Sequence, residues 1–196
     1  MPTEPTDRAL LDAWRGGDLT AGDALVSRHW ASISRFCRTK LGDDAADLIA
    51  QVFLACVEGR DRIDGDTIKA YLFAVARRRL ADHFRKRART PALDFAVSSL
   101  ADLGPGPATA LGDREQRALL QRGLARIPLD DQIALELAYG EGLSTRELAA
   151  VLEIAEPTVR SRLSRARARL RGVLDELGTP AEVALAESQL DPSSSG

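Results

Sequence analysis

Residues 142–173 read GLSTRELAAVLEIAEPTVRSRLSRARARLRGV, and this stretch carries the start signals of two successive helices. Ser144, followed three residues later by Glu147, forms a capping box, in which both side chains satisfy free backbone N–H groups at a helix N-terminus. The pattern therefore predicts a short helix, a turn at 153–156, and a longer helix. Pro157 falls in the first turn of the longer helix, where its missing N–H costs nothing.

The longer helix separates apolar and basic side chains. Its apolar residues recur at alternating steps of four and three, which indicates a packing stripe: Val159, Leu163, Ala166, Leu170 and Val173. Arginines occupy the other faces: Arg160, Arg162, Arg165, Arg167, Arg169 and Arg171. An exposed helix with arginine–glutamate pairs is one interpretation, but residues 157–172 contain almost no acid. A short helix, a tight turn and an arginine-rich helix instead favour a DNA-binding helix-turn-helix.

The N-terminal half also has helical periodicity. A capping signal at Thr20 predicts the start of one helix, Gly42-Asp43-Asp44 breaks the chain and starts a second, and a polar loop follows at 58–65. Asp66 is predicted to cap a third helix. The apolar positions expected to face inward are Leu25, Trp30, Ile33, Phe36, Cys37 and Leu41, then Leu48, Ile49, Val52, Phe53 and Cys56, then Leu72, Phe73, Ala76, Leu80 and Phe84.

Between these halves, residues 90–112 contain three prolines and three glycines that interrupt every periodic pattern. We predict a linker here. No stretch alternates as a strand does, so the predicted fold class is all-α, with two small helical domains at about 7–89 and 113–174.

An acidic tail is expected at 175–196. Thr179-Pro180-Ala181-Glu182 predicts a further short helix, with Val183, Ala186 and Leu190 at helical spacing. Two interpretations stay open for this helix. It either packs back on the second domain and modulates its DNA binding, or it is a frayed appendage with no role.

Charge is distributed in blocks of opposite sign. The formal net charge is −2, yet the blocks sum to −4 for 1–66, +7 for 67–89, −5 for 90–155, +5 for 156–172 and −5 for 173–196. Each basic block can neutralise phosphates locally, while the acidic background discourages indiscriminate adsorption to nucleic acid.

No apolar run approaches the roughly 18 to 20 residues that cross a bilayer, and the first residues lack the features of a signal peptide. We therefore expect a cytoplasmic protein without membrane insertion. Cys37 and Cys56 lie in apolar helical patterns, as small buried hydrophobes do. Their spacing to His29 and His83 matches no compact ligand set, so neither a metal site nor a cofactor is predicted.

The helix-turn-helix stretch resembles region 4 of the bacterial group IV, or extracytoplasmic-function (ECF), RNA polymerase sigma factors of the sigma-70 family. The resemblance rests on Ile127-Pro128, on Leu135-Glu136-Leu137, on 141–149 (EGLSTRELA) and on 158–167 (TVRSRLSRAR). A second, independent resemblance to region 2 rests on 43–48 (DDAADL), Phe53-Leu54, 71–77 (YLFAVAR) and Leu80-Ala81-Asp82.

The resemblance implies roles for individual residues. In region 4, the minus 35 base-reading positions are Arg160, Ser161, Ser164 and Arg165, and the backbone-contact positions are Thr158, Arg162 and Arg167. In region 2, the loop that captures a flipped minus 10 base corresponds to Ile63, Asp64, Gly65, Asp66 and Thr67, and the strand's phosphates lie along the basic run with Arg77, Arg78, Arg85 and Lys86. The clamp-binding helix carries Asp47, Gln51 and Leu54.

The implied partners are core RNA polymerase, through its β′ clamp and β flap, promoter DNA, and an anti-sigma factor. The resemblance implies no catalytic site. The chain departs from the family pattern at Ala155, where a serine often caps the recognition helix, and at Ala50-Gln51, Tyr71 and Arg78.

Two other functions are alternatives to a sigma factor. A helix-turn-helix regulator that is not a polymerase subunit would account for 113–174 but leave 7–89 unexplained. A small hydrolase or nuclease is disfavoured because His29 and His83 have no paired nucleophile in the sequence pattern.

Overall fold

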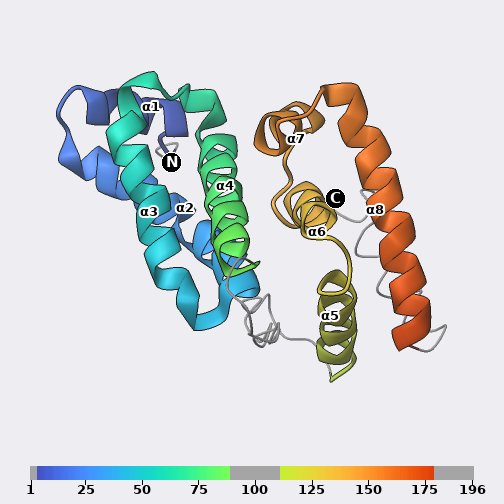
Figure 1. Ribbon diagram of the computed structural model, residues 1–196. Helices are drawn as coiled ribbons and strands as arrows, with labels where there is room; N and C mark the ends of the chain where they lie inside the picture. The colour runs from blue at the N-terminus through green and yellow to red at the C-terminus, as the bar shows by residue number, and fades with distance from the viewer. Residues whose placement is uncertain (1–3, 89–110, 179–196) are drawn as a thin grey trace. The chain divides into compact units, whose positions relative to one another are not determined.

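The computed structural model describes residues 4–88 and 111–178, and every regular element in these two ranges is helical (Figure 1). The chain divides into two compact units, residues 1–101 and 102–196. The predicted all-α fold with two helical units is therefore confirmed.

Within residues 4–88, the first unit contains four α-helices, with 3₁₀ turns between the second and third and between the third and fourth. The α-helices are α1 (Asp7–Arg15), α2 (Leu19–Leu41), α3 (Ala45–Gly59) and α4 (Ile68–Ala88), and the turns are η1 (Gly42–Asp44), η2 (Arg60–Arg62) and η3 (Gly65–Thr67). Helix α2 packs against α1, α3 and α4. The break predicted at Gly42 is real, since this residue ends α2 with φ 57°.

The core of the first unit is built from the apolar faces that the periodicity predicts, with one exception. Trp30 is predicted to face inward but is 46% exposed, and its ring stacks on the buried Phe53. Leu25, Val52, Phe73 and Leu80 are each no more than 1% exposed. Phe36 meets Phe73 edge to face with ring centroids 5.2 Å apart. Each such side chain contributes about 1.5–3 kcal/mol when fully buried, which fixes the four helices on one another.

Two predicted caps are wrong. The N-cap of α2 is Asp18, whose carboxylate accepts from the backbone N–H groups of Thr20 and Ala21. Thr20 lies inside the helix and donates its hydroxyl to the same carboxylate. Before α4 the capping side chain is Asp64, which accepts from the Asp66 N–H at 3.2 Å. The Asp66 carboxylate pairs with Arg8 instead of capping the helix.

Both cysteines are free and buried, as their apolar surroundings predict. Burial raises the pKa of the Cys37 thiol to about 12 and that of Cys56 to about 11. Because the thiolate is the reactive form, we expect neither cysteine to be labelled by a maleimide at about pH 8 in the folded protein. Mass spectrometry should show both labelled once guanidinium is added, and rapid labelling of the native chain would contradict the buried assignment.

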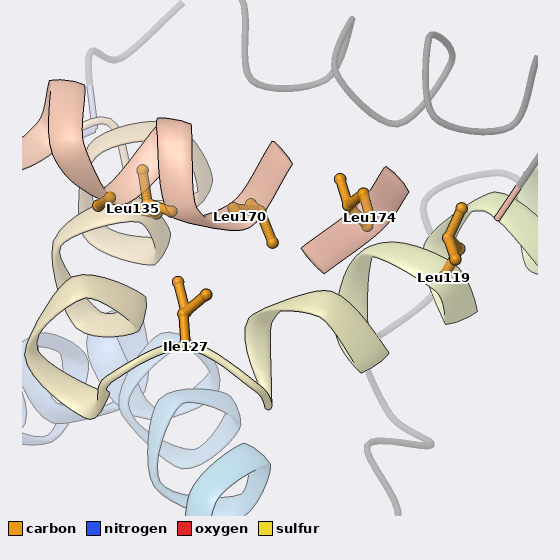
Figure 2. Close-up of a cluster of buried hydrophobic side chains, with 6 residues drawn as sticks. Leu119, Ile127, Leu135, Leu170 and Leu174 are labelled. Carbon is orange, nitrogen blue, oxygen red and sulfur yellow. The ribbon is translucent and has the colours of Figure 1, made fainter. Parts of the chain in front are cut away.

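The second unit contains α5 (Leu111–Leu124), α6 (Leu129–Leu135), a π-helical turn η4 (Glu136–Gly140), α7 (Thr145–Leu152) and α8 (Glu156–Leu177). Figure 2 shows a cluster of its core, in which α5, α6 and α8 contribute buried leucines around Ile127. The side chains in this cluster are Leu119, Ile127, Leu135, Ala166, Leu170 and Leu174. Helix α8 contacts α5, α6 and α7 and thus holds the unit together.

Helix α5 begins at Leu111, two residues before the predicted return of helical order at Asp113. The remaining predictions for the linker and for the helix at Thr179 fall on 89–110 and 179–196, which lie outside the described residues.

Candidate nucleic-acid interface

Helix α7 begins at the predicted capping box. The Glu147 N–H donates to the Ser144 hydroxyl oxygen at 3.3 Å, and the Ser144 N–H donates to Glu147 Oε2 at 2.8 Å. The reciprocal bonds satisfy two N–H groups that the first turn leaves free. Leu148, Val151 and Leu152 then bury the inner face of this short helix.

The turn between α7 and α8 depends on one residue in the left-handed region. Glu153 has φ 56° and ψ 41° and ends α7, and the following Ile154 N–H donates to the Ala149 carbonyl at 3.1 Å. Left-handed backbone costs a non-glycine residue energy. The turn redirects the chain within three residues, so that α8 starts at Glu156 with Pro157 in its first turn.

Helix α8 buries the predicted stripe, with a small change in register. Val159, Ala166 and Leu170 are fully buried, and Leu163 and Val173 are half-buried. Leu174 is the fully buried residue of the last turn. The prediction placed Val173 there, and the difference arises because a 3.6-residue period carries the buried stripe to position 174.

The faces of α8 that are not buried carry polar side chains, several of them near the N-terminus of the helix. Six of the seven predicted minus 35 positions are exposed: Thr158, Arg160, Ser161, Ser164, Arg165 and Arg167. The Ser161 hydroxyl donates to the Thr158 carbonyl at 2.9 Å, and Arg165 Nε donates to the Ser161 carbonyl at 3.3 Å. Arginines in this arrangement can reach base edges or phosphates in a major groove.

Two arginines of α8 are paired within the unit. Arg162 Nη1 lies 3.4 Å from Asp130 Oδ2, and the Arg162 side chain is only 26% exposed. Arg169 Nη1 forms an ion pair with Asp131, whose side chain is 7% exposed. The acids come from α6. They lie outside residues 157–172, in the acidic first turn of α6 that Leu129-Asp130-Asp131 forms after Pro128.

No side chain caps α8, because its N-cap is Ala155. We expect Ala155→Ser to raise the free energy of unfolding of the second unit by about 1 kcal/mol, since a serine hydroxyl satisfies a free N–H group. Chemical denaturation measures this change. Ala168→Ser in the exposed middle of the same helix is the matched control, and equal effects of the two changes would contradict a capping origin.

In the first unit the basic run lies on α4. Arg78, Arg85 and Lys86 are exposed, and Arg77 is half-buried. Arg85 forms an ion pair with Asp82. An open groove between α3 and α4 is lined by Asp43, Asp44, Asp47 and Gln51 from the α3 side and by Arg79 and Lys86 from α4. The groove thus brings two predicted polymerase-binding residues next to a predicted DNA-binding lysine.

The predicted base-capture loop is divided between buried and exposed residues. Ile63 is 5% exposed and Gly65 is also buried, whereas Asp64, Asp66 and Thr67 are exposed. The Thr67 hydroxyl donates to the Asp64 carbonyl at 3.1 Å. Ile63 and Gly65 therefore support the loop from inside, and only the exposed residues present side chains to a ligand.

The outer face of α3 carries Asp47, Gln51 and Leu54, all exposed. Leu54 is 54% exposed, and Val57 one turn later is 38% exposed. On the neighbouring α2, Trp30 is 46% exposed and stacks on Phe53 with ring centroids 5.2 Å apart. Exposed apolar side chains gathered in this way are typical of a protein-binding surface.

Each of the two units matches a known protein family model. Residues 25–90 match the family model "Sigma-70 region 2", and residues 117–170 match "Sigma-70, region 4". The chain is 30% identical over 179 residues to the ECF RNA polymerase sigma factor SigM of Mycobacterium tuberculosis, covering 90% of this chain and 88% of that protein. The chain belongs to the ECF sigma factors of the sigma-70 family. As a sigma factor it directs promoter-specific transcription with RNA polymerase.

Other relatives support the same assignment. The sigma factor is 29% identical to CnrH of Cupriavidus metallidurans, over 89% of its own length and 97% of that protein. A structure of CnrH in complex with the cytosolic domain of CnrY matches it with a TM-score of 0.64 at 25% identity, covering 87% of this chain and 97% of the other. The match to region 2 covers the N-terminal half of the sigma factor, which a helix-turn-helix regulator that is not a polymerase subunit would leave unexplained.

Within residues 4–88 and 111–178, no group of three or more His, Cys, Asp or Glu side chains is placed to hold a metal ion. None of the helices described has both the length and the apolar character that a membrane span requires.

Proposed function

We propose that α8 of this sigma factor reads the minus 35 element in the major groove. Arg160, Ser161, Ser164 and Arg165 contact base edges, and Thr158, Arg162 and Arg167 contact phosphates. The observation that carries this proposal is the exposure of six of these residues near the N-terminus of α8, within the region 4 match. Arg162 exchanges Asp130 for a phosphate, which costs little because Asp130 is 49% exposed.

The first unit recognises the minus 10 element as a melted strand. Asp64, Asp66 and Thr67 form the exposed rim that receives a flipped base, and Ile63 and Gly65 hold that rim from inside. The basic residues of α4 hold the phosphates on either side: Arg77, Arg78, Arg85 and Lys86. A base must leave the stack before its pairing edge is read, and a cationic helix beside the loop offsets the charge of the strand.

The outer face of α3 binds the β′ clamp through Asp47, Gln51 and Leu54, and the second unit contacts the β flap. The exposed Leu54 supports the clamp contact, because a half-exposed leucine between polar residues is characteristic of an interface. The domains concerned are the helices of residues 7–88 and 111–177, and the linker and tail predicted from the sequence join and follow them.

An anti-sigma factor is the remaining partner. Similar solved structures contain a sigma factor bound to CnrY or, for RpoE of Bartonella quintana (TM-score 0.61, 25% identity, 78% of this chain and 96% of that one), to the anti-sigma factor NepR. The protein acts in the cytoplasm with RNA polymerase and carries no catalytic site itself. RNA synthesis remains the chemistry of the polymerase.

Mapping transcript 5′ ends after overexpression tests the proposal. Induced transcripts should share two short sequence elements at about minus 35 and minus 10. Induction of transcripts that share only one element would contradict the two-site recognition.

A further inference from the structure

Helix α1 lies outside both family matches, the first of which begins at residue 25. Its apolar side is buried on α2 through Leu10, Leu11 and Trp14. It also contacts η2, which precedes the base-capture loop at residues 63–67, and η3, which forms the second part of that loop. Helix α1 thus packs against the base-capture loop, although neither family match covers this helix.

Arg15 binds the backbone at the start of the loop. Its Nε and Nη2 donate to the Arg60 carbonyl at 2.9 and 2.7 Å, and Nη2 also donates to the Ile63 carbonyl. The Arg60 carbonyl directly follows Gly59, the last residue of α3, and the Ile63 carbonyl belongs to the base-capture loop itself. The guanidinium of Arg60 lies 5.7 Å from the Trp14 ring, which adds a second contact between α1 and the same turn.

Arg8 binds the side chains at the other end of the loop. It forms a bidentate pair with Asp66 at 2.9 and 2.7 Å and donates to Asp64 Oδ1 at 3.0 Å. The same Asp64 oxygen accepts from the Asp66 N–H and so holds η3. The side-chain hydrogen bond from Arg8 lowers the pKa of the Asp66 carboxyl, so Asp66 carries its charge when Arg8 pairs with it.

The approach of α1 to the loop depends on Gly65. A Cβ at this position would lie 2.6 Å from the Cα of Arg8, which no side chain tolerates. The backbone of α1 thus rests directly on the loop between Asp64 and Asp66. The close contact between Gly65 and α1 fixes where Arg8 and Arg15 lie along the loop.

We propose that α1 braces the base-capture loop and that Arg8 and Arg15 are positioning residues for base selection at the minus 10 element. The inference rests on the proposed role of this loop. Arg15 fixes the path of the backbone, while Arg8 fixes the carboxylates and offsets part of the negative charge of Asp64 and Asp66, which would otherwise repel a DNA strand. Neither arginine contacts the base.

Exposed ion pairs contribute little to stability, so Arg8, whose side chain is 53% exposed, should affect loop geometry far more than folding. The core contacts of Leu10, Leu11 and Trp14 remain when Arg8 is replaced. Base selection and melting temperature therefore respond differently to its loss, which makes the proposal testable.

The test uses holoenzyme formed from core polymerase and the full-length sigma factor, with a promoter library randomised at both elements. Each promoter in the library carries a transcribed barcode that identifies its two elements, because the elements themselves lie upstream of the start site. The barcodes are sequenced in the run-off products from wild type, Arg8→Ala, Arg15→Ala, Arg8→Lys and Arg38→Ala. Arg38 is an exposed arginine near the end of α2 and serves as the charge-matched control. We expect Arg8→Ala and Arg15→Ala to reduce the minus 10 base preference about fivefold and to leave the minus 35 preference unchanged. Arg8→Lys should retain part of the preference, and Arg38→Ala all of it.

An unchanged minus 10 preference in both alanine variants would overturn the brace. So would an equal loss at both promoter elements, or a loss in Arg38→Ala, because each indicates a general effect on charge or folding. Melting temperatures measured alongside identify a variant that has unfolded, and a folded Arg8→Lys with altered minus 10 preference then decides in favour of the brace. If wild type itself shows no minus 10 preference, the base-capture role of the loop fails first.

Discussion

Arg165→Ala is expected to weaken binding to the minus 35 duplex by about 1 to 3 kcal/mol and to relax the base preference there. Arg165 is exposed on α8, and its Nε donates to the Ser161 carbonyl, which limits the rotation of the guanidinium. A guanidinium held in this way can offer a fork to a guanine edge. Arg167→Ala should instead weaken all sequences evenly, because a phosphate contact carries no sequence information.

Competition binding of holoenzyme to duplexes with the native or a scrambled minus 35 element separates these roles. Arg165→Ala should narrow the gap between the two duplexes, whereas Arg167→Ala should preserve the gap and reduce the salt dependence of binding. Identical behaviour of the two variants on both duplexes would contradict the assignment of base and phosphate contacts.

Leu54→Glu is expected to reduce affinity for core polymerase by about 2 kcal/mol or more, roughly thirtyfold. Leu54 projects from the outer face of α3 with 54% of its surface exposed, so a charge there should leave the fold intact. At a clamp interface the same charge would be buried without a partner, which is costly. Affinity is measured by titrating labelled sigma factor with core enzyme.

Leu19→Glu is the matched control, since Leu19 is 73% exposed at the start of α2 and lies outside the proposed clamp surface. It should bind core polymerase as wild type does. If Leu54→Glu and Leu19→Glu bind equally well, the clamp surface does not lie on this face of α3.

The features that the sequence predicted well are local. The capping box at Ser144, the turn and the start of α8 depend on residues within a few positions of one another, and the structure confirms them. The buried faces of the helices were predictable for the same reason, because a period of 3.6 residues is written into the order of apolar residues.

The features that the sequence did not predict join distant segments. Arg162 and Arg169 pair with Asp130 and Asp131 of another helix, and no pattern within α8 indicates this. Asp66 was predicted as a cap because it stands before a helical run, yet its carboxylate binds Arg8, which is 58 residues away in sequence. Where a side chain has two possible partners, tertiary packing determines which one it binds, and local sequence propensity does not describe that packing.

Run-off transcription with purified core polymerase shows whether the chain serves as a promoter-specific polymerase subunit. A promoter obtained from the mapped transcripts is supplied with core enzyme alone, with the purified chain alone, or with both. We expect a specific transcript only when both are present, and its loss when either promoter element is scrambled. Transcription from core enzyme alone, or specific DNA binding by the chain that never leads to core-dependent initiation, would contradict this role.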